Sequence, residues 1–237
     1  MTPKGAYLFT YNIIVGALWA HVLYDAIVAW MTHGTLPAVW EATATPLKFA
    51  QTPALLEVLH SVLGLVRSPP LVTGLQVASR LWLTWGVVAL VPGATTTQAV
   101  TLLSAGGQPV LQLSLLTLLG AWSVTEVIRY AFFALKELGL EPYPLLWLRY
   151  SSFVVLYPLG VASELAMVYL AMPSIRAERP WSLTMPNSLN ASFDYYVVCW
   201  SALFLYVPGF PKLYSYMLAQ RSKVLGAGGK AKARKNE

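Results

Sequence analysis

The sequence has little charge and almost no cysteine, and each shortage excludes a class of protein. Only 11% of its 237 residues are charged, whereas an average soluble domain holds about 25%. A single cysteine, Cys199, excludes an internal disulfide and a cysteine-based metal cluster. A cysteine phosphatase needs the pattern Cys-x5-Arg, and position 205 is Leu205. The composition therefore argues against an ordinary soluble domain, a disulfide-stabilised protein and a cysteine phosphatase.

Apolar and aromatic residues, in contrast, are abundant. The chain is 57% hydrophobic with a mean hydropathy of +0.57, which indicates an integral membrane protein. Nine tryptophans and thirteen tyrosines suit the interfaces of a bilayer, where their amphipathic rings concentrate. A membrane-spanning helix needs about twenty apolar residues. We predict an all-α polytopic membrane protein with six transmembrane helices in one bundle, over residues 7–31, 49–66, 71–91, 110–135, 145–171 and 193–218.

Lysine and arginine predict the orientation of these helices. Most basic residues fall on one side of the expected bundle, namely Lys4, Arg67, Lys136, Arg149 and the C-terminal tail. The other side holds Lys48, Arg176 and Arg179, and the segment 92–109 holds no basic residue. Cytosolic segments of membrane proteins are enriched in lysine and arginine. Both termini are therefore expected in the cytosol.

The end of the chain is predicted to be a basic tail, 219–237, that follows a membrane domain over 1–218. The tail holds six basic residues and one acidic residue, and its basic residues lack interleaved aromatic side chains. Nucleic acid is therefore not an expected partner. Arg234 and Lys235 resemble a dilysine retrieval signal of endoplasmic-reticulum membrane proteins, and a plain basic tail that only sets topology is the alternative.

Among the ionisable residues inside the predicted helices, seven are of particular interest: Asp25, Glu57, His60, Arg80, Glu126, Arg129 and Glu164. Ionisable groups are costly in a bilayer and usually face the interior of a bundle. Glu126 and Arg129 lie three residues apart on one helix face, so they are expected to neutralise each other or to pair with other helices. Structural ion pairing is the alternative to a functional role, and hydrogen-bonded packing is the alternative for His60.

The stretch LYPLGVASE places a tyrosine and a carboxylate on one helix face. Tyr157 and Glu164 are seven residues apart, which is nearly two helical turns and about 10 Å along the axis. Pro158 cannot donate a hydrogen bond to the carbonyl of Val154, and Gly160 permits close approach by a ligand or another helix. The pair suits acid–base catalysis. A packing tyrosine beside an ion-paired glutamate is the alternative that the spacing alone leaves open.

Four segments carry a resemblance to a known family. They are YNIIVGALW at 11–19, LLEVLHSVLGLVRSPPLVTGLQVASRLWLTWG at 55–86, WSVTEVIRYAFF at 122–133 and LLWLRYSSFVVLYPLGVASE at 145–164. With these segments the chain, from about residue 7 to 218, resembles the very-long-chain 3-hydroxyacyl-CoA dehydratase family, once called protein-tyrosine-phosphatase-like.

The resemblance implies a six-span protein of the endoplasmic reticulum that acts in fatty-acid elongation. Its expected reaction removes water from a long-chain or very-long-chain 3-hydroxyacyl-CoA to give the trans-2-enoyl-CoA, with no metal or other cofactor. The family's catalytic tyrosine and glutamate fall on Tyr157 and Glu164. Our preferred assignment makes Glu164 the base and Tyr157 the acid, and the reverse assignment stays open. Other elongation-cycle enzymes and the lipid bilayer are the expected partners.

Supporting residues are predicted by residue type. Arg80, Arg129 and His60 are candidate donors to a developing enolate oxygen, and Glu126 and Gly160 are further candidates in the site. Cytosolic residues such as Arg67 or Arg149 would meet the phosphates of CoA. Two rival functions are a non-catalytic scaffold of the elongation complex and a proton-coupled transporter, and the transporter is disfavoured because no internal repeat is visible.

Overall fold

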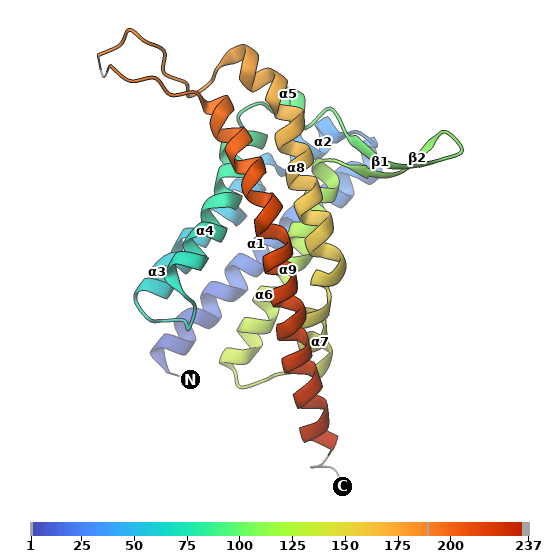
Figure 1. The fold of residues 1–237 in the computed structure, drawn as a ribbon. Coiled ribbons are helices and arrows are strands. Elements are labelled where there is room, and N and C mark those ends of the chain that lie inside the picture. The colour runs from blue at the N-terminus through green and yellow to red at the C-terminus, as the bar shows by residue number, and fades with distance from the viewer. Residues whose placement is uncertain (1, 189, 234–237) are drawn as a thin grey trace.

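The computed structural model describes residues 2–188 and 190–233, and the side chains only as far as residue 226. The chain is mostly helical (Figure 1). Its elements, in chain order, are α1 (Pro3–His33), α2 (Leu36–Gln51), α3 (Ala54–Val62), α4 (Pro70–Leu81), the π-helix η1 (Trp82–Val88), α5 (Pro92–Thr95), β1 (Val100–Ala105), β2 (Gln108–Leu113), α6 (Leu115–Glu137), α7 (Tyr143–Ser151), α8 (Phe153–Glu178) and α9 (Tyr195–Ala233).

Four of these helices are long and apolar enough to cross a membrane. They are α1, α6, α8 and the Tyr195–Gly226 part of α9. They overlap the predicted spans 7–31, 110–135, 145–171 and 193–218, but α8 begins at Phe153 and the first residues of the span 145–171 belong to α7. The prediction of a helical membrane protein with several spans is therefore confirmed. The segments 49–66 and 71–91, in contrast, are not among the helices that are long and apolar enough to cross a membrane.

The predicted span 49–66 is interrupted by a helix break. Helix α2 covers much of the expected loop 32–48, because Val39, Leu47 and Ala50 recur at helical spacing and are buried, and it packs against α1. A turn at Thr52–Pro53 then separates α2 from α3, which has nine residues. Proline cannot donate the next helical hydrogen bond and restricts the residue before it, so the chain bends there.

The prediction of an all-α fold is wrong at one place, the hairpin β1–β2. Val100 pairs with Leu113 and Ala105 pairs with Gln108 in antiparallel register. Gly106 and Gly107 form the turn with φ of 58° and 76°. Two residues with positive φ are what a tight hairpin turn requires, and a Gly-Gly pair supplies them without strain. Helix α6 consequently begins at Leu115 and not at residue 110.

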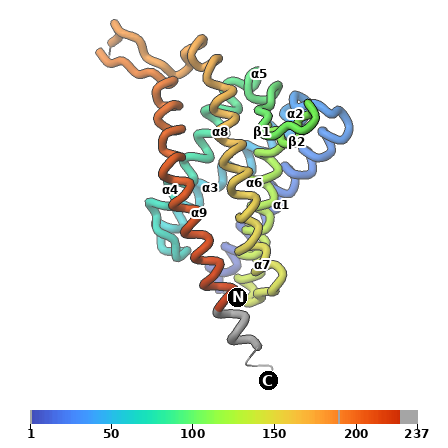
Figure 2. The backbone as a smooth tube through the Cα atoms, turned by 45° about the vertical axis from the view of Figure 1, so that its right-hand side comes forward, coloured from blue at the N-terminus to red at the C-terminus, as the bar shows by residue number. Residues whose placement is uncertain are grey.

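Helix α6 lies at the centre of the bundle. It packs against α1 on one side and α8 on the other, and α9 packs mainly against α8. Helix α9 crosses the front of the molecule beside α8 in Figure 1 and runs along one side of it in Figure 2. The start of α1 and the end of α9 point toward the same end of the bundle in both views. Buried side chains such as Trp19, Leu118 and Met167 fill the space between α1, α6 and α8.

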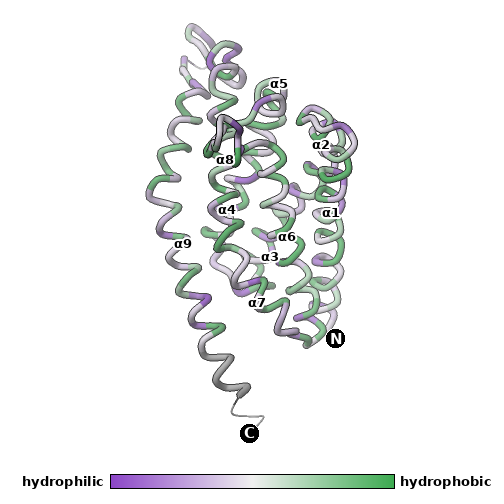
Figure 3. Tube along the Cα trace, turned by 90° about the vertical axis from the view of Figure 1, so that its right-hand side faces the viewer, coloured by the Kyte–Doolittle hydropathy of each residue, from purple (hydrophilic) through white to green (hydrophobic). Residues whose placement is uncertain are grey.

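Apolar residues recur along the outer helices, as Figure 3 shows by the green stretches of the tube. Phe204, Leu205 and Val207 of α9 are each about 70% exposed, as expected for side chains that face lipid. Helix α9 continues past the predicted boundary at residue 218 to Ala233. The proposed retrieval signal at Arg234 and Lys235 lies outside the described residues.

Candidate active site

Helix α8 carries the predicted catalytic pair and passes between α6 and α9. The helix continues through Pro158. The hydroxyl of Tyr214, on α9, donates to the carbonyl of Val154 over 3.4 Å, where the proline cannot. A hydrogen bond from the neighbouring helix therefore replaces the helical one next to the site.

Glu164 is held by one donor on each carboxylate oxygen. Its Oε1 accepts a hydrogen bond of 2.9 Å from the indole Nε1 of Trp122 on α6. Its Oε2 accepts one of 2.7 Å from the hydroxyl of Tyr206 on α9. In the part of the chain that the structure describes, Glu164 has no ion-pair partner. The alternative of an ion-paired structural glutamate is thus not supported, since both of its donors are neutral.

Tyr157 has its ring packed against α9. The ring stacks on Phe210, with centroids 5.3 Å apart, and lies parallel to Tyr214 at 6.3 Å. Among the described residues, none hydrogen-bonds the Tyr157 hydroxyl. This hydroxyl is therefore available to a bound molecule.

Gly160 lies between the two residues and faces α6. A Cβ atom at this position would lie 3.7 Å from Cβ of Ala121 and 3.9 Å from Cδ1 of Trp122. These are ordinary van der Waals distances, so an alanine would also fit against α6, and a close approach that requires Gly160 stays a prediction. Tyr157, Gly160 and Glu164 together form a strip of α8 that is flanked by α6 and α9.

A second polar cluster, which we call the charged tetrad, consists of Glu57, Arg80, Glu126 and Arg129. Arg129 donates to both oxygens of Glu57, each at 2.8 Å, and also to Glu126 at 2.7 Å. Arg80 donates to the other oxygen of Glu126, and Tyr130 donates to Glu57. The predicted pairing of Glu126 with Arg129, and across helices, is confirmed. The tetrad joins α3, α4 and α6, and its two positive and two negative charges cancel.

Arg80 connects the charged tetrad to the Glu164 site. Its guanidinium carbon lies 4.5 Å from the ring centre of Trp122 and 5.3 Å from that of Trp19. Its Nη1 contacts Glu126, but its buried Nε and Nη2 find no hydrogen-bond partner among the described residues. Because the indole of Trp122 bonds Glu164, the cation and the carboxylate contact the same side chain.

The remaining predicted residues lie elsewhere. His60 bonds the Tyr7 hydroxyl over 2.8 Å and packs against the Tyr11 ring, which supports its reading as a packing histidine. Asp25 contacts His21 at 3.4 Å, one turn away. Arg149, on α7, lies near the rings of Phe133 and Tyr150 and has no carboxylate partner within the described ranges.

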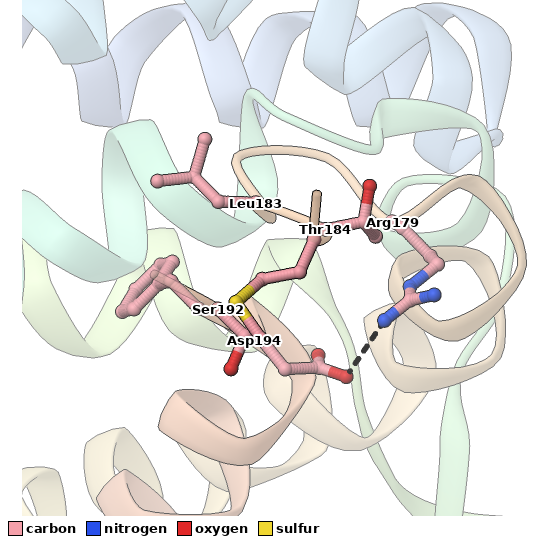
Figure 4. A pocket seen from close by; sticks show the side chains of 7 residues that line it. Arg179, Leu183, Thr184, Ser192 and Asp194 are labelled. Carbon is pink, nitrogen blue, oxygen red and sulfur yellow. Dashed lines mark hydrogen bonds and ion pairs between the residues drawn. The ribbon is translucent and has the colours of Figure 1, made fainter. Parts of the chain in front are cut away.

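A pocket also lies away from the site on α8. It lies at the connection between α8 and α9, where Arg179 and Asp194 form an ion pair of 3.4 Å beside Leu183, Thr184 and Ser192 (Figure 4). Arg179 follows Glu164 by fifteen residues, which is roughly 20 Å along a helix. Across the described residues, no group of three or more metal-ligating side chains occurs.

Two residues of the site, Trp122 and Tyr206, were not predicted from the sequence. Trp122 belongs to the motif at 122–133, but the sequence alone does not indicate what it contacts. Tyr206, Phe210 and Tyr214 recur at four-residue spacing, so they share a helix face. That periodic aromatic face was the available signal, and it is easily taken for ordinary packing.

Fold and site together define a polytopic helical membrane protein with a polar site that is built around α8 and is linked to a partly buried, charge-neutral cluster. The chain belongs to the protein tyrosine phosphatase-like family, PTPLA. The model of this family matches residues 51–227.

Curated relatives share nearly the whole chain. The very-long-chain (3R)-3-hydroxyacyl-CoA dehydratase PASTICCINO 2 of Arabidopsis thaliana is 46% identical over 94% of this chain and 94% of its own length. The dehydratase PASTICCINO 2A of Oryza sativa subsp. japonica is 45% identical over 96% and 95%. The human very-long-chain (3R)-3-hydroxyacyl-CoA dehydratase 2 is 37% identical over 93% and 81%. No solved structure is significantly similar.

Proposed function

We propose that this protein is a hydro-lyase that converts very-long-chain 3-hydroxyacyl-CoA to trans-2-enoyl-CoA in fatty-acid elongation. The observation that carries the proposal is the strip on α8, where, among the described residues, Glu164 accepts hydrogen bonds only from neutral donors and the Tyr157 hydroxyl has no partner. The names and the near full-length similarity of the relatives support the same reaction.

The reaction needs one base and one acid on neighbouring carbons. Glu164 removes the proton from C2, and the electron pair of that C–H bond forms the C2–C3 double bond. The C3–O bond breaks as Tyr157 gives its proton to the leaving hydroxyl, so water departs. Solvent then returns the proton from Glu164 to Tyr157. The unoccupied Tyr157 hydroxyl favours this assignment over the reverse, because an acid must be free to reach the substrate.

The thioester oxygen gains negative charge as the C2 proton leaves, so a nearby donor accelerates the step. Three residues were candidates for this donor. His60 already bonds Tyr7, and Arg129 is fully engaged by Glu57 and Glu126. Arg80 has two buried N–H groups without partners in the described chain. Arg80 is therefore the donor that we assign to the developing enolate.

The substrate has an apolar tail and a highly charged head, and the protein offers a surface for each. The acyl chain would lie among the apolar helices. Arg149 and the exposed Arg67, in the turn before α4, would meet the phosphates of CoA; neither has an ion-pair partner among the described residues. Figure 1 shows α7 and the α3–α4 turn toward the end of the bundle where α1 begins. We assign this end to the cytosol of an endoplasmic-reticulum membrane, where other elongation-cycle enzymes are the expected partners.

We further propose that the chain crosses the membrane six times. The four long helices account for four crossings. The broken pair α2–α3 and the continuous pair α4–η1 would supply the other two. An even number of crossings is supported by the common end at which α1 begins and α9 ends (Figure 2). The charge distribution supports a cytosolic position for that end.

Topology can be tested with engineered glycosylation. An Asn-x-Ser/Thr acceptor placed in the turn at Gly106–Gly107 should be glycosylated in microsomes, because the hairpin is on the lumenal side in this arrangement. The same acceptor added after the C-terminus should stay unmodified. A glycosylated C-terminus would contradict the six-crossing arrangement. The control is the same insertion with the acceptor asparagine replaced by glutamine.

The proposed activity is tested by purifying the protein in detergent and supplying 3-hydroxypalmitoyl-CoA. Enoyl-CoA should form with no added metal or nicotinamide cofactor, as followed by chromatography of the CoA thioesters. A folded, monodisperse preparation that forms no enoyl-CoA from this substrate or from longer homologues would favour the non-catalytic scaffold.

A further inference from the structure

We infer that Tyr206 of α9 is a positioning residue that orients the Glu164 carboxylate for proton removal at C2. The inference rests on the proposed dehydratase function and extends it to a helix that holds neither of the two reacting groups. Its basis is the 2.7 Å hydrogen bond from the Tyr206 hydroxyl to Glu164 Oε2.

A glutamate carboxyl group is free to turn about its last bond, because that torsion has no sharp staggered minima. The Trp122 indole bonds Oε1, and this single contact leaves the plane of the carboxylate undefined. The Tyr206 hydroxyl bonds Oε2 from another helix. Two donors on different oxygens fix both the plane and the position of the carboxylate, and the remaining lone pairs are left for a substrate proton.

The bond from Tyr206 is part of a wider contact between α9 and the strip on α8. Phe210 and Tyr214 lie one and two turns further along the same face of α9 and pack on the Tyr157 ring. Tyr214 also donates to the carbonyl of Val154, which Pro158 leaves without a helical donor. One face of α9 therefore positions both reacting residues at once.

Tyr206 is suited to positioning rather than to acid catalysis. Its hydroxyl proton is directed at Glu164, so it is not available to the leaving group at C3. The Tyr157 hydroxyl, which has no partner in the described chain, is the available acid. Tyr206 therefore acts on the reaction through Glu164 and not through the substrate.

The variant Tyr206→Phe tests this role because it keeps the ring and removes only the hydroxyl. We expect kcat to fall about tenfold to a hundredfold, the effect of a small misplacement of a reacting group, while KM changes less than about twofold. The primary isotope effect with substrate deuterated at C2 should increase, because C2–H cleavage becomes slower relative to other steps. Tyr216→Phe is the matched control, since Tyr216 is an exposed α9 tyrosine bonded to Gln220.

A double variant separates positioning from a general effect on structure. If Tyr206 acts through Glu164, adding Tyr206→Phe to Glu164→Gln should lower the residual rate little further, because coupled residues are not additive. If the rate losses of the two single variants multiply in the double variant, Tyr206 does not act through Glu164. The positioning role is also overturned if the wild type is active and Tyr206→Phe has the same kcat and isotope effect as Tyr216→Phe. A folded wild type without dehydratase activity would instead overturn the proposed function itself.

Discussion

Glu164→Gln should slow dehydration at least about a hundredfold, the usual lower range for loss of an acid–base group. The amide has nearly the shape of the carboxyl group but cannot take up the C2 proton. Tyr157→Phe should cause a loss of similar size, because the ring can still stack on Phe210 while the proton for the leaving hydroxyl is missing. Both rates are to be measured with purified protein and 3-hydroxypalmitoyl-CoA under saturating substrate.

Folding must be shown to be intact for these results to bear on catalysis. Both variants should insert in membranes and elute from a sizing column like the wild type, since neither removes a partner of an ion pair. Val155→Ala is a suitable control on the same helix, because the Val155 side chain is 68% exposed. A near-normal kcat in either variant would remove that residue from the mechanism.

Arg129→Met should be the most destabilising single change in the membrane region. Arg129 neutralises Glu57 and Glu126 together, and the Glu126 side chain is only 3% exposed. Removing one member of a buried ion pair costs about 3–5 kcal/mol, because the partner's charge stays buried without compensation. Thermal unfolding in detergent should show a markedly lower midpoint. The double variant Arg129→Met with Glu57→Gln should recover part of the loss, since it removes one uncompensated charge.

Arg80→Met provides the contrast within the same tetrad. Arg80 contacts Glu126, which would still be paired with Arg129. We therefore expect a smaller loss of stability than for Arg129→Met but a lower kcat, because the donors assigned to the enolate are removed. If Arg80→Met is as unstable as Arg129→Met and its folded fraction has normal kcat, the assignment of Arg80 to the thioester oxygen is wrong.

The strip on α8 that we propose as catalytic could be located from the sequence because it is local in the chain. Tyr157, Gly160 and Glu164 lie on one helix, so the helical repeat alone sets their relative positions. The pairing of Glu126 with Arg129 is likewise a matter of three-residue spacing. In both cases no knowledge of the packing between distant segments was needed.

Contacts between distant segments could not be read in the same way. Residue type made Arg80, Arg129 and His60 equivalent donors, and only helix packing shows which N–H groups are engaged. The contact between Tyr206 and Glu164 spans 42 residues, and the sequence holds no sign of that register. The hairpin was missed for a different reason, because the Gly-Gly turn signal lay in a segment taken for a plain loop.

The charged tetrad also constrains the order of events during synthesis. Glu57 and Arg129 are 72 residues apart, so the acidic residue enters the membrane region long before its cationic partner has been translated. An unpaired carboxylate in α3 is costly in hydrocarbon, and the Arg80 cation in α4 has the same difficulty until Glu126 arrives. The ion pairs that join α3 and α4 to α6 can therefore form only once α6 has emerged from the ribosome. Truncation before residue 126 would leave Glu57 and Arg80 without the partners that they have in the folded protein.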